Sequence, residues 1–258
     1  MQYWTQSEKN IFVAAHRGWC GKYPENTMAA FRAALELGVD QIETDVRVTK
    51  DGELVLIHDG TVDRTTNGTG AVDAYTFEEL RKLDAGNGEK IPTLIELMEL
   101  VKDHPTLTLD IELKEYPTEG REALSYSVCD RVLEVIDRYG FTDRCVVNTF
   151  RGKLHEYIAE KYKAKYKQHV YYPARHLGAC EKDPYAYAYC TCIFGLEDEV
   201  TAEDAKALHE KYGVRIWAGA YVKDEQGVDL AVKIGSELIT CNNPDEILDI
   251  LRKRGLHK

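Results

Sequence analysis

The sequence predicts a (β/α)₈ barrel, and three observations support this fold class. The chain has 258 residues, which is the usual size of one such barrel. From Ile11 onward, short apolar segments alternate with longer amphipathic ones, as strands and helices do in parallel α/β folds. Charged residues follow several of the short segments, at the strand ends where these barrels build their active sites. We therefore expect residues 1–258 to form a single domain.

The first strand–helix–strand unit sets the direction of the predicted sheet. An apolar strand at 11–15 precedes a loop, and the helix that follows has apolar residues at helical spacing. Asn26 or Thr27 is suited to cap the start of this helix, and Gly38 is suited to end it. A second strand begins at Gln41. Two strands joined through a helix pair in parallel.

The second strand carries two acidic residues and leads into a hairpin. Glu43 and Asp45 are two positions apart, so their carboxylates share one face of the strand. Lys50-Asp51-Gly52 predicts a tight turn, and a strand at 54–57 returns the chain to His58-Asp59. Two carboxylates and an imidazole suit a hard cation beside an acid–base group. An edge hairpin with solvated charges would show the same pattern.

A polar segment at 61–90 interrupts the alternation after the hairpin. It contains the run TTNGTG and a short helical stretch at 76–83, so we expect a small insertion above the barrel. A helix at 93–101 and a strand at 107–112 follow. Polar residues alternate with leucine and isoleucine along this strand and put Glu112 and Lys114 on its polar face. Polar side chains that point inward are typical of a barrel strand near the barrel mouth.

The rest of the chain continues the same alternation. Strands are predicted at 145–149, 166–170, 190–194, 214–217 and 237–241, and helices at 123–139, 153–162, 202–212, 227–234 and 244–254. The tyrosine-rich segment 173–189 is predicted to be irregular. Without the return strand of the hairpin, the predicted strands number eight, as a barrel of this type requires.

Composition excludes several classes of protein. The net charge of −11 argues against nucleic acid and anionic membranes as partners. No segment approaches the roughly 20 apolar residues of a membrane span, and the first ten residues lack the features of a signal peptide. We therefore expect a cytoplasmic protein with no integral membrane segment. Seven scattered cysteines are predicted to be free thiols.

Five short motifs, taken in order, resemble the glycerophosphodiester phosphodiesterase family. They are His16-Arg17-Gly18, Pro24-Glu25-Asn26-Thr27, Glu43-x-Asp45, His58-Asp59 and Glu112-x-Lys114. The resemblance is dense over residues 11–114 and weaker beyond, and the segment 61–90 is similar to the family's insertion. The resemblance implies a TIM barrel that hydrolyses a glycerophosphodiester to glycerol 3-phosphate and an alcohol with the help of a metal ion.

The resemblance also implies roles for particular residues. Glu43, Asp45 and Glu112 correspond to the ligands of one Mg²⁺ or Ca²⁺ ion. His16 and His58 correspond to an acid–base pair. The candidates for binding phosphate or substrate are Arg17, Lys114, Glu25, Asn26 and Trp217. The chemistry agrees, because a phosphodiester needs its negative charge neutralised and needs a base and an acid at its two oxygens. Water or a hydroxyl of the substrate itself could be the nucleophile.

Several candidates have a structural alternative. Arg17 could form a salt bridge with Glu43, and Glu25 and Asn26 could cap the first helix. Lys114 could extend along the barrel rim, and Trp217 could be a packed aromatic. These alternatives stay open at the level of the sequence.

Two segments depart from the family pattern. Residues 240–243 are Thr-Cys-Asn-Asn where the family usually has Thr-Asp, and residues 217–220 are Trp-Ala-Gly-Ala where Trp-Thr-Val-Asn is common. Both fall on the predicted pocket rim and concern the alcohol side of the substrate. Two other functions are compatible with the same motifs: a related phosphodiesterase that acts on lysophospholipids, and a non-catalytic barrel that binds phosphodiesters. The sequence has no long apolar loop with which to bind a bilayer, and this argues against the lysophospholipid function. A non-catalytic barrel would be expected if a histidine or a metal ligand were missing, and none of these residues is missing.

Overall fold

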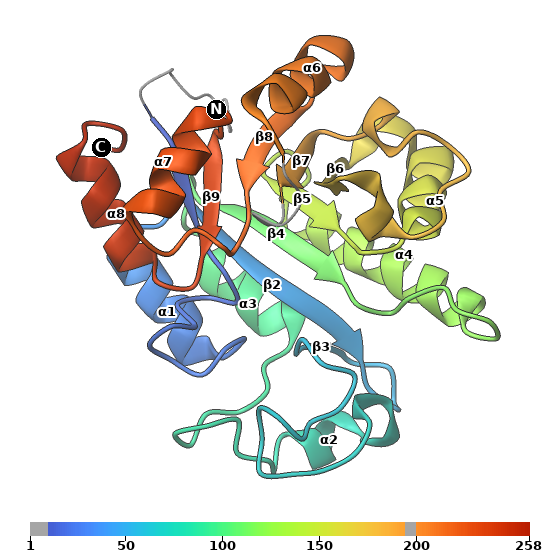
Figure 1. Cartoon of the computed structure of the whole chain (residues 1–258). Coiled ribbons are helices and arrows are strands. Elements are labelled where there is room, and N and C mark those ends of the chain that lie inside the picture. Colours follow the sequence, from blue (N-terminus) through green and yellow to red (C-terminus); the bar gives the residue numbers. More distant parts are fainter. Residues whose placement is uncertain (1–9, 194–199) are drawn as a thin grey trace.

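A closed barrel of eight parallel strands forms the centre of the molecule (Figure 1). The computed structural model describes residues 10–193 and 200–258. The barrel strands are β1 (Phe12–Ala15), β2 (Gln41–Val48), β4 (Thr108–Leu113), β5 (Cys145–Asn148), β6 (Lys167–Tyr172), β7 (Cys190–Ile193), β8 (Arg215–Ala218) and β9 (Leu238–Cys241). β1 pairs with both β2 and β9, which closes the barrel. The predicted TIM barrel is confirmed.

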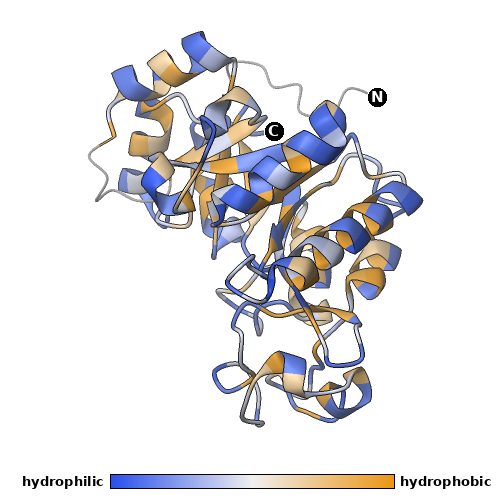
Figure 2. Ribbon diagram, turned by 90° about the vertical axis from the view of Figure 1, so that its right-hand side faces the viewer, coloured by the Kyte–Doolittle hydropathy of each residue, from blue (hydrophilic) through white to orange (hydrophobic). Residues whose placement is uncertain are grey.

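Helices between the strands cover the outside of the barrel. They are α1 (Met28–Leu37), α3 (Leu94–Val101), α4 (Glu122–Arg138), α5 (Gly152–Tyr162), α6 (Ala202–Tyr212), α7 (Glu225–Lys233) and α8 (Pro244–Lys253). Hydrophilic residues lie on many of the outer helix faces in Figure 2, which is the pattern of amphipathic helices packed on a sheet. Each predicted helix is present, with small differences at its ends.

A few sequence predictions need correction or lie outside the described residues. The segment 173–189 is not wholly irregular, because it contains short 3₁₀ turns at Ala174–Leu177 and Pro184–Ala186. A third 3₁₀ turn, Lys163–Lys165, follows α5. The last residue of the strand predicted at 190–194, Phe194, and the polar start of the chain are not among the described residues.

The ends of α1 show why the chain turns where it does. Thr27 caps the helix, since its hydroxyl accepts a hydrogen bond from the amide of Ala30. Gly38 ends it in the left-handed conformation at φ 81°, which glycine adopts without a steric penalty. Neither Glu25 nor Asn26 caps the helix, so the structural alternative considered for them does not apply. Asn26 instead turns its side chain toward β2.

The hairpin and the insertion form a unit at one end of β2 (Figure 1). β3 (Leu54–Leu56) pairs antiparallel with β2. Residues 61–90 contain a 3₁₀ turn, Val72–Ala74, and the one-turn helix α2 (Phe77–Leu80). A separate apolar cluster holds this unit together and consists of Val55, Ile57, Val62, Val72, Leu80, Ala85 and Ile91. The insertion is therefore packed on the hairpin through a small core of its own.

The barrel interior becomes polar at the C-terminal ends of the strands. Glu43 lies opposite Asp110, and Asp45 lies opposite Glu112, in the register of β2 and β4. All four side chains are buried.

No helix in the described ranges is both long enough and apolar enough to cross a membrane. All seven cysteines are free thiols.

The separate core of the insertion predicts a local response to mutation. Leu80 and Leu97 are both fully buried, the first in the insertion and the second in the barrel core. Each Leu→Ala change should cost about 2–5 kcal/mol at its own site. We expect Leu80→Ala to speed hydrogen exchange and proteolysis within 61–90 and to lower the melting temperature less than Leu97→Ala does. Equal loss of global stability in the two variants would show that the insertion and barrel unfold as one unit.

Candidate active site

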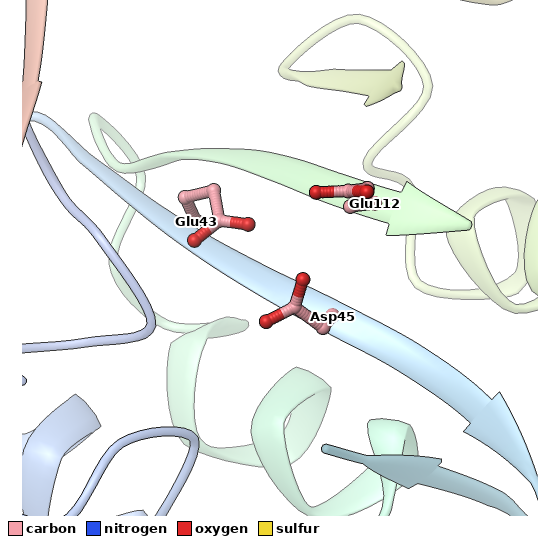
Figure 3. Close-up of side chains that lie close together, drawn as sticks. All are labelled: Glu43, Asp45 and Glu112. Atoms are coloured by element: carbon pink, nitrogen blue, oxygen red, sulfur yellow. The ribbon is translucent and has the colours of Figure 1, made fainter. Parts of the chain in front are cut away.

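Three buried carboxylates meet at the mouth of the barrel. Glu43 and Asp45 project from β2 and Glu112 projects from β4 (Figure 3). One oxygen of each lies within 4.8 Å of the others. The parallel register of the two strands produces this grouping, because it sets Asp45 beside Glu112. The cluster that the sequence predicted is therefore assembled.

Two cations partly balance the negative charge of the cluster. The Lys114 ammonium lies 2.5 Å from Glu112 Oε1 and 3.2 Å from Asp45 Oδ1. Arg17 places its Nε 3.3 Å from Asp45 Oδ2, and its backbone amide donates to Glu43 Oε2 at 2.8 Å. The guanidinium thus pairs with Asp45 and not, as the sequence alternative had it, with Glu43. Three carboxylates still face two cations.

The electrostatics of the cluster suit a bound cation. Burial, and then repulsion from Asp45, raises the pKa of Glu43 well above its usual range. Burial also raises the pKa of Glu112 to about 7. At Asp45 burial acts in the same direction, but attraction to Lys114 and Arg17 outweighs it and lowers the pKa. A divalent ion would relieve the repulsion between the carboxylates and bind Asp45 Oδ1, which has the Lys114 ammonium 3.2 Å away but accepts no hydrogen bond within the described ranges. These residues therefore fit a hard cation held by oxygen.

His16 reaches the site from the end of β1. Its Nδ1 lies 2.7 Å from Asn242 Oδ1, and an amide oxygen can only accept, so Nδ1 carries the hydrogen. The other ring nitrogen, Nε2, lies 3.8 Å from Glu43 Oε2. Burial, and then repulsion from Arg17, lowers the pKa of His16 to about 4. His16 is therefore neutral near pH 7, with a lone pair on Nε2.

His58 reaches the same site from the hairpin. Its Nδ1 lies 2.6 Å from Asp59 Oδ1, and Arg47 Nε donates to its carbonyl oxygen at 2.9 Å. Burial lowers the pKa of His58, although attraction to Asp45 and the bond to Asp59 oppose this. The Asp59 carboxylate holds the ring in one orientation and favours its protonated form.

Both histidines line one cavity of about 120 Å³. The other lining residues are Arg17, Glu43, Asp110, Glu112, Asn148, Phe150, His169, Tyr171, Cys192, Gly219, Ala220 and Thr240. Five of the site residues predicted from the sequence thus line this cavity: His16, Arg17, Glu43, His58 and Glu112. These five residues put two imidazoles, a guanidinium and two of the three clustered carboxylates around one small volume.

The remaining predicted residues lie outside the cavity wall. Asn26 donates to Asp45 Oδ2 at 2.8 Å and accepts from the hydroxyl of Thr44 at 2.8 Å. Glu25 Oε1 accepts from Arg17 Nη1 at 3.0 Å. Trp217 is 1% exposed and packs in the barrel interior, as in the packed-aromatic alternative. Lys114 is equally buried beside the carboxylates, so it does not extend along the rim.

Two residues of the site escaped the sequence analysis. Asn242 orients His16 and lies in the segment noted above for its departure from the family pattern. Arg64, in the insertion, donates to both oxygens of Asp59 and to both oxygens of Glu25 at 2.7–3.1 Å. It therefore links the partner of His58 to the partner of Arg17. Arg64 stands directly before the TTNGTG run, but no local pattern indicates which carboxylates it reaches.

A model described as the glycerophosphoryl diester phosphodiesterase family matches residues 16–230. The chain belongs to this family. A family member from Caldanaerobacter subterraneus, named glycerophosphodiester phosphodiesterase, is 35% identical over 94% of this chain and 98% of its own length. The chain is therefore an enzyme of the phosphodiesterase class.

Solved structures of the family show the same fold. A protein from Silicibacter pomeroyi, provisionally named a glycerophosphoryl diester phosphodiesterase, superposes with a TM-score of 0.84 at 23% identity and covers 98% of this chain and 97% of its own. A phosphodiesterase from Oleispira antarctica, in complex with the product sn-glycerol-3-phosphate, superposes with a TM-score of 0.77 at 23% identity, over 94% and 97% of the two chains. At these identities the likeness concerns the fold.

The four hydrogen bonds of Arg64 predict a role at a distance from the reacting atoms. Arg64→Ala should leave the fold intact, because its side chain is 49% exposed. Release of Asp59 and Glu25 should nevertheless loosen His58 and Arg17 and lower kcat about ten- to a hundredfold. A matched control is Arg254→Ala, which removes a surface arginine that also pairs with two carboxylates. Equal kcat values for the two variants would show that Arg64 does not position the site.

Proposed function

We propose that the enzyme hydrolyses glycerophosphodiesters to glycerol 3-phosphate and an alcohol with one divalent cation and an acid–base pair formed by His16 and His58. The observation that carries this proposal is the shared cavity, in which both histidines, Arg17, Glu43 and Glu112 face one small volume. A phosphodiester held there would have cationic, basic and acidic groups within reach. That combination is what phosphoryl transfer to an oxygen nucleophile requires.

The cation would be held by the carboxylates of Glu43, Asp45 and Glu112. When bound, it supplies positive charge for the phosphoryl oxygens as negative charge builds on them. Arg17 supports the same charge through its guanidinium. The Lys114 ammonium lies beside Asp45 and Glu112 and favours the ionised form of each, in which they act as ligands. Mg²⁺ and Ca²⁺ both suit three carboxylate ligands, with the remaining positions filled by water or substrate.

The two histidines have surroundings that favour different roles. His16 is held neutral with a lone pair on Nε2, so it would remove the proton from the attacking hydroxyl or water. Burial lowers the pKa of His58 as well, but the bond to the Asp59 carboxylate opposes this, so of the two histidines His58 is the one that would donate a proton to the departing alkoxide. A phosphate anion between the rings would further favour the protonated form of His58. One proton is thus taken up and one released in each turnover.

Removal of the metal should abolish turnover. We expect EDTA to stop release of glycerol 3-phosphate, and Mg²⁺ or Ca²⁺ to restore it. Glu43→Gln should weaken cation binding, measured by titration calorimetry, because it removes one anionic ligand. A matched control is Glu156→Gln, since Glu156 is also buried but bonds to backbone amides away from the cluster. Full activity after exhaustive chelation would exclude the proposed metal dependence.

The histidine pair can be tested by changing the leaving group. His16→Ala and His58→Ala should each lower kcat on a natural diester by roughly 10²–10⁴, the usual contribution of one acid–base group. The wild-type rate should rise and then fall with pH, since the base must be neutral and the acid protonated. A p-nitrophenolate leaving group needs no acid, so His58→Ala should recover most of its activity on that substrate while His16→Ala should not. Recovery by His16→Ala instead would reverse the two assignments.

A further inference from the structure

The floor of the cavity contains a second set of buried polar side chains that the proposed mechanism does not use. Asp110, Asn148, His169 and Tyr171 all line the cavity. Each is no more than 5% exposed. They lie on β4, β5 and β6, and Asn148 is the register partner of both Glu112 and His169. This set therefore continues around the barrel from the metal-binding carboxylates.

Hydrogen bonds fix these four side chains relative to one another. The Tyr171 hydroxyl donates to Asn148 Oδ1 at 3.0 Å, and Asn148 Nδ2 donates to Asp110 Oδ1 at 2.6 Å. The second oxygen of Asp110 lies 2.6 Å from Nδ1 of His169. Because a carboxylate only accepts, Nδ1 carries the hydrogen in this bond. The chain of bonds ends at the His169 ring.

The other ring nitrogen of His169 is left without a partner. Nε2 is buried and makes no hydrogen bond to any residue in the described ranges. Packing fixes the ring as well, because Trp217 stands edge-on to it at 5.0 Å and Tyr171 lies 5.1 Å away, centre to centre. A buried, unsatisfied polar atom is unfavourable. A rigid one that lines a binding cavity indicates a contact to be made by a ligand.

A second buried histidine shows what a purely structural role looks like in this protein. His155 is fully buried. Its Nδ1 lies 2.8 Å from Gln168 Oε1 and its Nε2 lies 3.1 Å from the carbonyl oxygen of Thr149. Both of its nitrogens are therefore satisfied. His169 differs in that only one nitrogen is satisfied and the ring lines the cavity.

We propose that His169 Nε2 binds a hydroxyl group of the glycerol moiety that stays with the phosphate. This inference rests on the proposed function. With Nδ1 protonated, a neutral ring offers a lone pair at Nε2, which accepts from a hydroxyl but repels the acceptor oxygens of a phosphate. A charged ring would donate to the same hydroxyl, since hydroxyls act in both ways. A hydroxyl is thus suited to either state of His169.

The size of the cavity favours the glycerol moiety over the alcohol. A cavity of about 120 Å³ is small compared with the roughly 300–1,000 Å³ of sites that take drug-sized ligands, so a small group is suited to the space beside the phosphate. A three-carbon polyol is such a group. A larger alcohol would extend out of the cavity toward the loops. His169 therefore becomes a specificity residue for glycerol and not for the headgroup.

Binding of two matched phosphate monoesters tests the proposal without turnover. Glycerol 3-phosphate and propyl phosphate have the same carbon skeleton and differ only in the two hydroxyls. In the presence of Mg²⁺, the wild-type enzyme should bind glycerol 3-phosphate about ten- to a hundredfold more tightly, as expected for a buried hydrogen bond that is otherwise unmade. His169→Phe should remove most of this preference and change the Kd of propyl phosphate by less than about threefold. His169→Gln, which keeps a polar end, should retain part of it.

Controls separate the proposal from general damage. His155→Phe also removes a buried histidine, so it measures the cost to stability, and it should leave the ratio of the two Kd values unchanged. If His169→Phe fails to fold, His169→Gln and the wild-type ratio still decide the matter. Equal affinity of the wild-type enzyme for the two ligands would overturn the proposal, as would a ratio that His169→Phe does not alter. Failure of the proposed function would appear separately, as wild-type enzyme with metal that releases no glycerol 3-phosphate from any diester.

Discussion

The burial of three carboxylates at the barrel mouth is the constraint on which the rest of the site depends. Desolvated carboxylates repel one another and are costly unless cations and donors surround them. Asp45 shows how the chain meets this cost, because it is contacted by Arg17, Asn26 and Lys114 at once. These partners come from the loop after β1 and from the end of β4. These two segments therefore supply the cations and the amide donor that offset the cost of burying Asp45.

Backbone conformation reflects the same demand. Arg17 and Asn26 both adopt the left-handed region, at φ 54° and 55°, which is uncommon for residues other than glycine. This conformation lets Arg17 direct its amide to Glu43 and its guanidinium to Asp45. It also lets the Asn26 side chain point toward β2 and not toward the start of α1. Gly18 follows at φ 72° with Ala30 close behind it, so even a methyl group there would lie 2.8 Å from the α1 backbone. The tight packing of α1 against this turn holds the strained residues in place.

The sequence revealed the fold and the chemistry to different extents. The alternation of strands and helices is local, so the order and type of the elements could be predicted, and Thr27 and Gly38 marked the ends of α1. Glu43 and Asp45 could be paired because two-residue spacing puts them on one face of a strand. Asn242, Arg64 and His169 could not be assigned roles in this way, because each bonds to a residue that is distant in the sequence, at 226, 39 and 59 positions, respectively. Only the closed barrel brings such residues together.

Closure of the barrel therefore completes the site as well as the fold. His16 follows the first strand and Asn242 follows the last, and these two strands pair directly. The His16 ring is oriented by Asn242 only when β1 and β9 meet. His58 enters separately on the hairpin, where Arg64 joins Asp59 to Glu25 and so connects the insertion to the loop before α1. The barrel thus fixes one histidine through its closure and the other through an added unit with a core of its own. Because the insertion can change without disturbing β2 and β4, variation there would act on the position of His58 before it acts on the three clustered carboxylates.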